Sequence, residues 1–233
     1  MKKVVDLVYF LLSFLSLFTM AGCLALAAAP AAFLFQAAWR AADPGRPWLS
    51  ALRLSSAFGA GFVLFIPGLM LLTVLLRNLF WLRNREGAGR FYQLAAVRTT
   101  IYNFLLNINR LFSLPFVRGT PLMVWFYRGM GCRIGRDTFI LTTRLWDVDL
   151  IEIGDGCLIG GNVAVNAHVI SHGKGALRRV RIGNGVTIGA DTLVLPGAQI
   201  EDQVVVGAGS VVPLGARLER CGVYEGVPLK KVR

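Results

Sequence analysis

RIGNGVTIGADTLVLPGAQIEDQVVVGAGSVVPLGARL, residues 181–218, is the stretch that decides the fold. Aliphatic residues recur in it at every sixth position, and a small or β-branched residue follows four positions after each of the first six. A period of six fits neither an α-helix, with about 3.6 residues per turn, nor a simple strand, with a period of about two. The aliphatic series is Ile182, Ile188, Val194, Ile200, Val206, Val212 and Leu218.

A fixed short period of this kind is typical of a β-helix. Each hexapeptide makes one short strand and one bend, and three of them close a triangular coil of about 18 residues. The aliphatic side chains then point into the prism, and glycines relieve the bends. Successive coils pair as parallel strands about 4.8 Å apart. The sequence therefore predicts an all-β prism over its C-terminal half.

The repeat also runs upstream, but less regularly. Its aliphatic positions there are Ile134, Ile140, Ile153, Ile159 and Val165. Two interruptions, at residues 144–152 and 169–180, break the period. Insertions in a solenoid become loops that project from a coil, often on the binding face. The second interruption begins directly after His168 and is rich in basic residues, so we expect it to border the functional site.

Composition points to membrane segments ahead of the repeat. Hydrophobic residues make up 55% of the 233-residue chain and charged residues 16%, whereas soluble domains carry about 25% charged residues. This balance excludes intrinsic disorder and disfavours a wholly soluble protein. Residues 7–39 and 54–76 contain no charged residue, and each run exceeds the roughly 20 residues that cross a bilayer. We predict two transmembrane α-helices.

Both apolar segments admit an alternative. Pro67 and Gly68 lie inside the second, which is either a kinked span or a re-entrant hairpin. The first follows Lys2 and Lys3, as the core of a cleaved signal peptide does, but that core is only about 7–15 residues long.

Positive charge predicts the orientation and the division into domains. Lys and Arg near both outer ends of the two segments, Lys2 and Lys3 before and four arginines after, place these ends in the cytoplasm. We predict a multi-pass protein of the cytoplasmic membrane with its C-terminal domain facing the cytoplasm. The expected parts are a membrane anchor (1–85), a basic amphipathic helical connector (86–130) and the β-helix (131–233).

The net charge of +12 and the connector's arginines suit an anionic membrane surface better than nucleic acid. The connector helix either lies in the membrane interface or packs on the next domain.

Four segments of the repeat region carry recognisable motifs: IEIGDGCLIGGNVAVNAH (151–168), RIGNGVTIGADTLVLPGAQI (181–200), VVVGAGSVVP (204–213) and YEGVPLKKVR (224–233). With them the repeat region resembles the hexapeptide-repeat acyltransferases, and within them the sugar and antibiotic O-acetyltransferases such as galactoside and maltose acetyltransferase. The resemblance implies a left-handed parallel β-helix. Two further segments are RGTPLMVWFYRGMGCRIGRD (118–137) and WDVDLIEIGD (146–155). This shorter stretch is similar to the membrane-attached C-terminal region of polylysine-type peptide synthetases.

The resemblance implies transfer of an acyl group, most simply acetyl from acetyl-CoA, to a hydroxyl or amine, in a homotrimer. Only two histidines occur in the chain, and His168 stands where the family's catalytic histidine lies, so we predict it as general base. Asp149, about one coil earlier, is the expected orienting partner of His168, and Asp147 is a weaker candidate for the same role. Asp149 alternatively caps backbone N–H groups at a bend. Asp147 and His172 are predicted to bind substrate, and His172 is alternatively a plain surface residue.

The resemblance also implies where CoA binds. Backbone N–H groups of Ala190 and Ala208 face the donor, and Lys230 and Arg233 meet its phosphates or else form a solvated tail. No metal is expected, because two histidines in one loop cannot supply the three that zinc needs in the carbonic anhydrases built on this prism. The predicted acceptor is an envelope-related or lipid-linked molecule. The alternative function is a non-catalytic trimeric scaffold.

Overall fold

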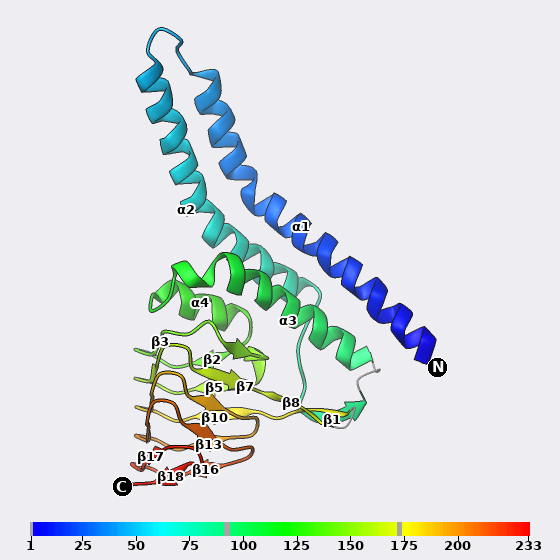
Figure 1. Cartoon of the computed structure of the whole chain (residues 1–233), viewed down its shortest axis with the longest axis vertical. Helices are drawn as coiled ribbons and strands as arrows, with labels where there is room; N and C mark the ends of the chain where they lie inside the picture. The colour runs from blue at the N-terminus through cyan, green and yellow to red at the C-terminus, as the bar shows by residue number, and fades with distance from the viewer. Residues whose placement is uncertain (1, 91–93, 172–173) are drawn as a thin grey trace. The chain divides into compact units, whose positions relative to one another are not determined.

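A computed structural model describes residues 2–90, 94–171 and 174–233 (Figure 1). Contacts between Cα atoms divide the chain into two compact units, Met1–Leu76 and Arg77–Arg233.

Two long apolar helices form most of the first unit, α1 (Lys2–Arg40) and α2 (Pro47–Leu79). Phe14–Arg40 and Pro47–Leu79 have mean hydropathies of 2.0 and 2.3 and are long and apolar enough to cross a membrane. At 1.5 Å per residue α2 measures about 50 Å, more than the roughly 30 Å hydrocarbon core. The helix runs unbroken through Pro67, so the segment does not fold back on itself at this proline.

Small residues allow α1 and α2 to pack closely. A Cβ added at Gly61 would lie 2.5 Å from the Cβ of Ala31, a separation that real atoms do not tolerate. Close approach at glycine and alanine is typical of helix pairs in membranes, where small residues let backbones meet. The guanidinium of Arg53, on α2, donates a hydrogen bond to the carbonyl oxygen of Ala41, in the connection between the helices, at 2.6 Å.

The second unit begins with a helical layer. Its elements are β1 (Gly87–Arg90), α3 (Leu94–Phe112), the 3-10 helix η1 (Leu114–Phe116) and α4 (Pro121–Gly129). The predicted connector helix is thus present as α3. Its Tyr102 is fully buried and donates a hydrogen bond to the Met130 carbonyl oxygen at 2.8 Å. These contacts show that α3 packs on the second unit, which agrees with the interpretation of the connector as a helix packed on the next domain.

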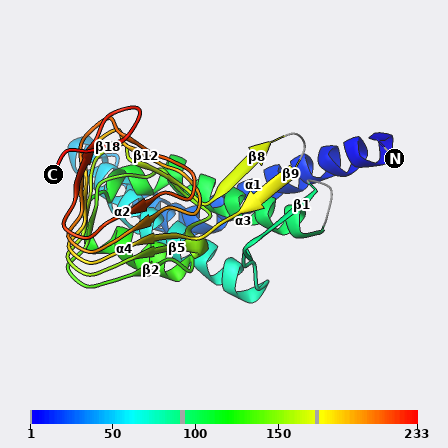
Figure 2. The same ribbon diagram turned by 90° about the horizontal axis from the view of Figure 1, so that it is seen from below.

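Short strands then wind into a prism of stacked coils (Figure 2). Ile182 pairs with Ile200 and Ile200 with Leu218, each eighteen residues further along the chain. The strands form three parallel sheets, in the orders β16-β13-β10-β5-β2, β17-β14-β11-β6-β3 and β15-β12-β7-β4. Their bounds are β2 (Arg133–Ile134), β3 (Phe139–Ile140), β4 (Leu145–Trp146), β5 (Ile151–Ile153), β6 (Leu158–Ile159), β7 (Ala164–Asn166), β10 (Val180–Ile182), β11 (Thr187–Ile188), β12 (Leu193–Val194), β13 (Gln199–Ile200), β14 (Val205–Val206), β15 (Val211–Val212), β16 (Arg217–Leu218) and β17 (Val223–Glu225). A last strand, β18 (Lys230–Lys231), pairs antiparallel with β17.

The predicted aliphatic series forms the core of the prism. All seven of its members, from Ile182 to Leu218, are buried, and upstream Ile140, Ile153, Ile159 and Val165 are buried as well. The six-residue period therefore predicted both the coil and its interior.

Both interruptions carry local structure. The first contains the 3-10 helix η2 (Val148–Leu150). The second is a hairpin of β8 (His168–Ser171) and β9 (Lys174–Leu177), and β1 adds to its edge as a third antiparallel strand. Figure 2 shows β8 and β9 extending away from the coils.

Candidate active site

His168 lies at the point where the chain leaves the prism. Strand β7 ends at Asn166, and β8 begins at His168 and leads into the projecting hairpin. The His168 side chain is 34% exposed, so a small molecule can reach it. Its Nδ1 forms a short hydrogen bond with Oδ2 of Asp147, which is fully buried.

Asp147 is itself held in place by the backbone and by a neighbour. It caps η2 in the left-handed conformation, with φ 52° and ψ 49°, which aspartate tolerates better than most residues. The side-chain amide of Asn103, on α3, donates a hydrogen bond to the other carboxylate oxygen, Oδ1, at 2.8 Å. Asn103, Asp147 and His168 therefore form one chain of hydrogen bonds from the helical layer to the hairpin.

The orienting partner of His168 is Asp147, the weaker of the two candidates from sequence, and the preference for Asp149 is wrong. The pairing of Trp146 with Asn166 spans 20 residues rather than 18, so counting 18 back from the histidine stops two residues short. Asp149 instead accepts hydrogen bonds from the backbone N–H of Asn84 at 2.6 Å and from its side-chain amide at 3.0 Å. This matches the alternative, a carboxylate that binds backbone N–H groups. Burial raises the pKa of Asp149 to about 6.

The hydrogen bond with Asp147 sets the protonation of His168. A carboxylate only accepts hydrogen bonds, so Nδ1 of the imidazole carries the proton and Nε2 keeps a free lone pair. The bond also raises the pKa of His168 above its usual 6.5, against an opposing effect of burial. The arrangement is that of an oriented base, able to take a proton from a bound hydroxyl or amine.

Ala190 and Ala208 occupy equivalent places on neighbouring coils. Both are exposed, and neither N–H group donates to another protein group within the described residues. A Cβ at Gly189 would lie 2.4 Å from the Ala208 nitrogen, and one at Gly160 would lie 2.8 Å from the Ala190 nitrogen. These glycines therefore allow the coils to stack closely and leave two outward-facing donors.

The remaining predicted residues lie at the C-terminus and in the hairpin. Lys230 and Arg233 are exposed, and their side chains form no ion pair within the described part of the chain. Their neighbour Lys231 differs, because its ammonium group contacts the Glu219 carboxylate at 2.6 Å. His172 lies outside the described residues.

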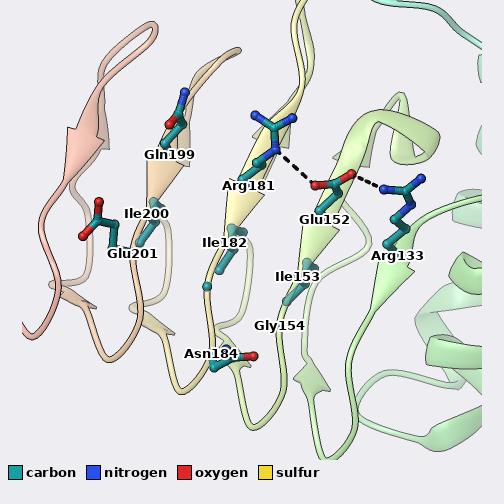
Figure 3. A pocket seen from close by; sticks show the side chains of 11 residues that line it. Arg133, Glu152, Ile153, Gly154, Arg181, Ile182, Asn184, Gln199, Ile200 and Glu201 are labelled. Atoms are coloured by element: carbon teal, nitrogen blue, oxygen red, sulfur yellow. Dashed lines mark hydrogen bonds and ion pairs between the residues drawn. The ribbon is translucent and has the colours of Figure 1, made fainter.

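A separate groove of about 430 Å³ lies on the sheet that contains β5 and β10 (Figure 3). Its lining includes neither His168 nor Asp147. Glu152 at its edge contacts the guanidinium groups of Arg133 at 2.8 Å and Arg181 at 3.2 Å (Figure 3). Because these charges satisfy one another, the groove presents no free catalytic group. Among the described residues, no cluster of three His, Cys, Asp or Glu side chains could hold a metal ion.

Family comparison agrees with the repeats. Residues 179–213 match the family described as bacterial transferase hexapeptide (six repeats), and residues 151–167 match the hexapeptide repeat of succinyl-transferase.

Three curated proteins are similar in sequence. "Putative acetyltransferase YvoF" of Bacillus subtilis (strain 168) is 31% identical over 116 residues, which are 47% of this chain and 67% of YvoF. Galactoside O-acetyltransferase of Escherichia coli (strain K12) is 35% identical over 119 residues, 47% of this chain and 57% of that protein. Delta-poly-L-ornithine synthetase of Acinetobacter baumannii (strain AB307-0294) is 26% identical over 115 residues, 49% of this chain but 9% of the synthetase. The chain thus spans less than two thirds of two of these relatives.

A solved structure shares the fold. It is a galactoside acetyltransferase in complex with coenzyme A, with a TM-score of 0.50 and 21% identity, and the match covers 64% of this chain and 86% of that one. Together with the repeats, this likeness confirms the left-handed parallel β-helix and both resemblances predicted from sequence. By its repeats, its relatives and its fold, the chain belongs to the hexapeptide-repeat acyltransferase family.

Proposed function

We propose that the protein is an acetyltransferase that uses acetyl-CoA to acylate a hydroxyl or amine. The observation that carries this proposal is the hydrogen-bonded pair of His168 and Asp147, a partly exposed imidazole oriented by a buried carboxylate. The relatives support the reaction class, since two of the three are named as acetyltransferases.

In this mechanism Nε2 of His168 takes the proton from the acceptor as its oxygen or nitrogen bonds to the acyl carbon. Asp147 keeps the proton on Nδ1 and stabilises the imidazolium that forms. The carbon–sulfur bond breaks, and the proton on Nε2 passes to the departing sulfur. Acetyl-CoA, when bound, supplies the activated acyl group.

Four residues are proposed to hold the donor. The N–H groups of Ala190 and Ala208, on exposed residues, have no protein acceptor within the described part of the chain and suit carbonyl oxygens of the thioester or of its amide-containing arm. Lys230 and Arg233, exposed and without ion pairs in the described chain, suit the phosphates. Asp147, predicted from sequence to bind substrate, is reassigned as the positioning residue of the base.

We further propose a homotrimer anchored in the cytoplasmic membrane by α1 and α2, with the β-helix in the cytoplasm. The lengths and hydropathies of the two helices support spanning, and the basic residues flanking them support this orientation. An anchor of this kind favours an acceptor that is envelope-related or linked to a lipid. Reporter fusions at residue 43 and at the C-terminus test the topology, and only the fusion at residue 43 should report from outside the cytoplasm.

The activity is tested by incubating detergent-purified protein with acetyl-CoA carrying a labelled acetyl group and with extracted membrane lipids, sugars and amines. We expect label to enter one acceptor class, and to do so far more slowly with His168→Ala. Arg220→Ala, at an exposed position in a later coil than His168, is the matched control. Failure of the protein to bind acetyl-CoA would overturn the proposal and leave a non-catalytic scaffold.

A further inference from the structure

Two arginines near Trp146, whose ring meets that of His168, form no ion pair within the described residues. The Arg110 guanidinium, on α3, lies over the Trp146 ring, with Cζ 3.7 Å from the ring centroid. The Trp146 ring in turn meets the His168 ring edge to face, with centroids 6.4 Å apart. The sum of these two distances is the largest possible separation between Cζ of Arg110 and the centre of the imidazole ring. This limit is roughly the length of one sugar ring with a substituent.

The hydrogen-bonding capacity of Arg110 is nearly unused. Its side chain is half-buried, yet within the described chain it forms no ion pair, and its one hydrogen bond to a side chain is a long one of 3.4 Å to Asn107. A guanidinium has five N–H donors. Stacking on Trp146 fixes the plane of the group, so its free edge is a preorganised receptor for a two-oxygen anion.

Arg144 adds a second positive charge. It is exposed and stands two residues before Trp146, on whose ring Arg110 stacks, and its guanidinium donates to the Asn162 carbonyl oxygen at 3.3 Å. Burial, and secondarily the charge of Arg144, lowers the pKa of Arg110. No carboxylate pairs with Arg144 in the described residues. The carboxylate nearest in sequence, Asp147, is fully buried and occupied by Asn103 and His168. Two nearby positive charges without a carboxylate partner repel each other, and a bound anion relieves this repulsion.

We propose that Arg110 and Arg144 bind a phosphate group of the acceptor and so place its hydroxyl or amine at His168. This inference rests on the proposed function for its biological meaning, and it names the substrate class as a phosphate-bearing molecule. The phosphate is either part of a water-soluble sugar phosphate or carried by a membrane lipid, and both present the same oxygens to the guanidinium groups.

Chemical modification of His168 tests anion binding without requiring acetyl transfer. In a His172→Ala background His168 is the sole histidine, and the rate of its reaction with diethyl pyrocarbonate can be followed spectroscopically. The protein is held in nanodiscs of neutral phosphatidylcholine, with free pyrophosphate added, or in nanodiscs that also contain phosphatidic acid. Glucose serves as the uncharged control.

We expect a phosphate probe to slow the modification and glucose to have no effect. Protection by free pyrophosphate identifies a site reached from water, and protection by phosphatidic acid alone identifies a lipid-borne phosphate. No protection by either probe overturns the proposal, even if acetyl transfer has been demonstrated. If a phosphate probe protects His168 but the protein transfers no acetyl group, the anion site is supported and the proposed function is overturned.

Variants assign the protection to the two arginines. Arg110→Met should raise the half-protecting concentration about tenfold or more, because a charge-assisted, two-point contact is lost. Arg110→Lys keeps the positive charge but loses the planar guanidinium, so its half-protecting concentration should lie between those of the wild type and Arg110→Met. Arg144→Met, at an exposed position, tests the site should Arg110→Met disturb folding, and Arg220→Met is the matched control. Rates are compared with and without probe within each variant, so changes in His168 reactivity cancel. Equal protection in all variants would refute the assignment.

Discussion

Asp147→Asn is expected to disable His168 while leaving the imidazole in place. The buried side chain at position 147 has two partners, the Asn103 amide and Nδ1 of His168. In the variant, the single remaining oxygen accepts from Asn103, so the new NH₂ group faces Nδ1. Nδ1 must then accept a hydrogen bond, and the ring proton moves to Nε2, the atom that has to receive the acceptor's proton.

The expected loss follows from the loss of the base. General base catalysis contributes about 100- to 10,000-fold to a rate, so kcat should fall within that range. The KM for acetyl-CoA should change little, because Asp147 is fully buried and is not one of the four residues proposed to hold the donor. The substitution keeps the size of the side chain, so stability should fall far less than it does when a buried charge is left unpaired.

The pH dependence separates this mechanism from simple misfolding. The carboxylate of Asp147 raises the pKa of His168, and only the neutral imidazole acts as a base. Wild-type kcat/KM should therefore rise with pH through a value above 6.5, and the residual activity of Asp147→Asn should rise at lower pH. Thiol release from acetyl-CoA between about pH 5 and 9 measures both profiles. If Asp147→Asn leaves kcat unchanged and leaves the pH at which kcat/KM rises unchanged, the proposed pairing of Asp147 with His168 is refuted.

Three further substitutions test the surroundings of the site. Asn103→Ala removes one charge-assisted hydrogen bond from the Asp147 carboxylate behind the base. It should lower kcat about tenfold with little change in KM, and it should lower the pH at which kcat/KM begins to rise, the acid limb of the profile. Asn103→Gln should restore part of the rate, and an unmoved acid limb would argue that Asn103 does not position Asp147. Asp149→Asn should leave the acid limb unchanged, because that carboxyl does not contact His168. Its raised pKa of about 6 means that its contribution to the free energy of unfolding is complete below about pH 4 and lost as the pH rises through 6; thermal melts across this range should show that slope in the wild type and not in the variant. Gly189→Ala should destabilise the fold by about 1–3 kcal/mol and weaken acetyl-CoA binding, since its Cβ would meet the Ala208 nitrogen at 2.4 Å; denaturation and titration measure both, and a wild-type stability would contradict the close stacking.

The repeat made the prism predictable because burial and period coincide. Each sixth residue has to point inward, so Ile182, Ile200 and Leu218 could be stacked on one another before any coordinate was known. Their pairing confirms this stack. Handedness does not follow from a period, and it came from the family.

Counting along the repeat brought both Asp147 and Asp149 near His168 but favoured the wrong one. The interruption before β5 lengthens one coil to 20 residues, which moves Asp147 into the place expected for Asp149. Asn103 lies on α3, outside every repeat, so no spacing relates it to the histidine. Asn103 is one of three asparagines on α3, and nothing in the sequence distinguishes it from Asn107 and Asn109.

The hairpin was also predicted incompletely. Residues 87–90, GAGR, have none of the alternation typical of a strand, yet they pair as β1 with β9. Pairing at the edge of a sheet uses backbone hydrogen bonds and depends little on the type of side chain. Sequence patterns therefore identify the loop but not the strand that joins it.

The most direct test of the account is the rate at which acetyl-CoA releases its thiol in the presence of a productive acceptor, compared between the wild type and His168→Ala in the same detergent. We predict acceptor-dependent release by the wild type and by Arg220→Ala, and a rate lower by about 100-fold or more with His168→Ala, while acetyl-CoA still binds. Equal rates for the wild type and His168→Ala would contradict the claim that His168, held by Asp147, is the base.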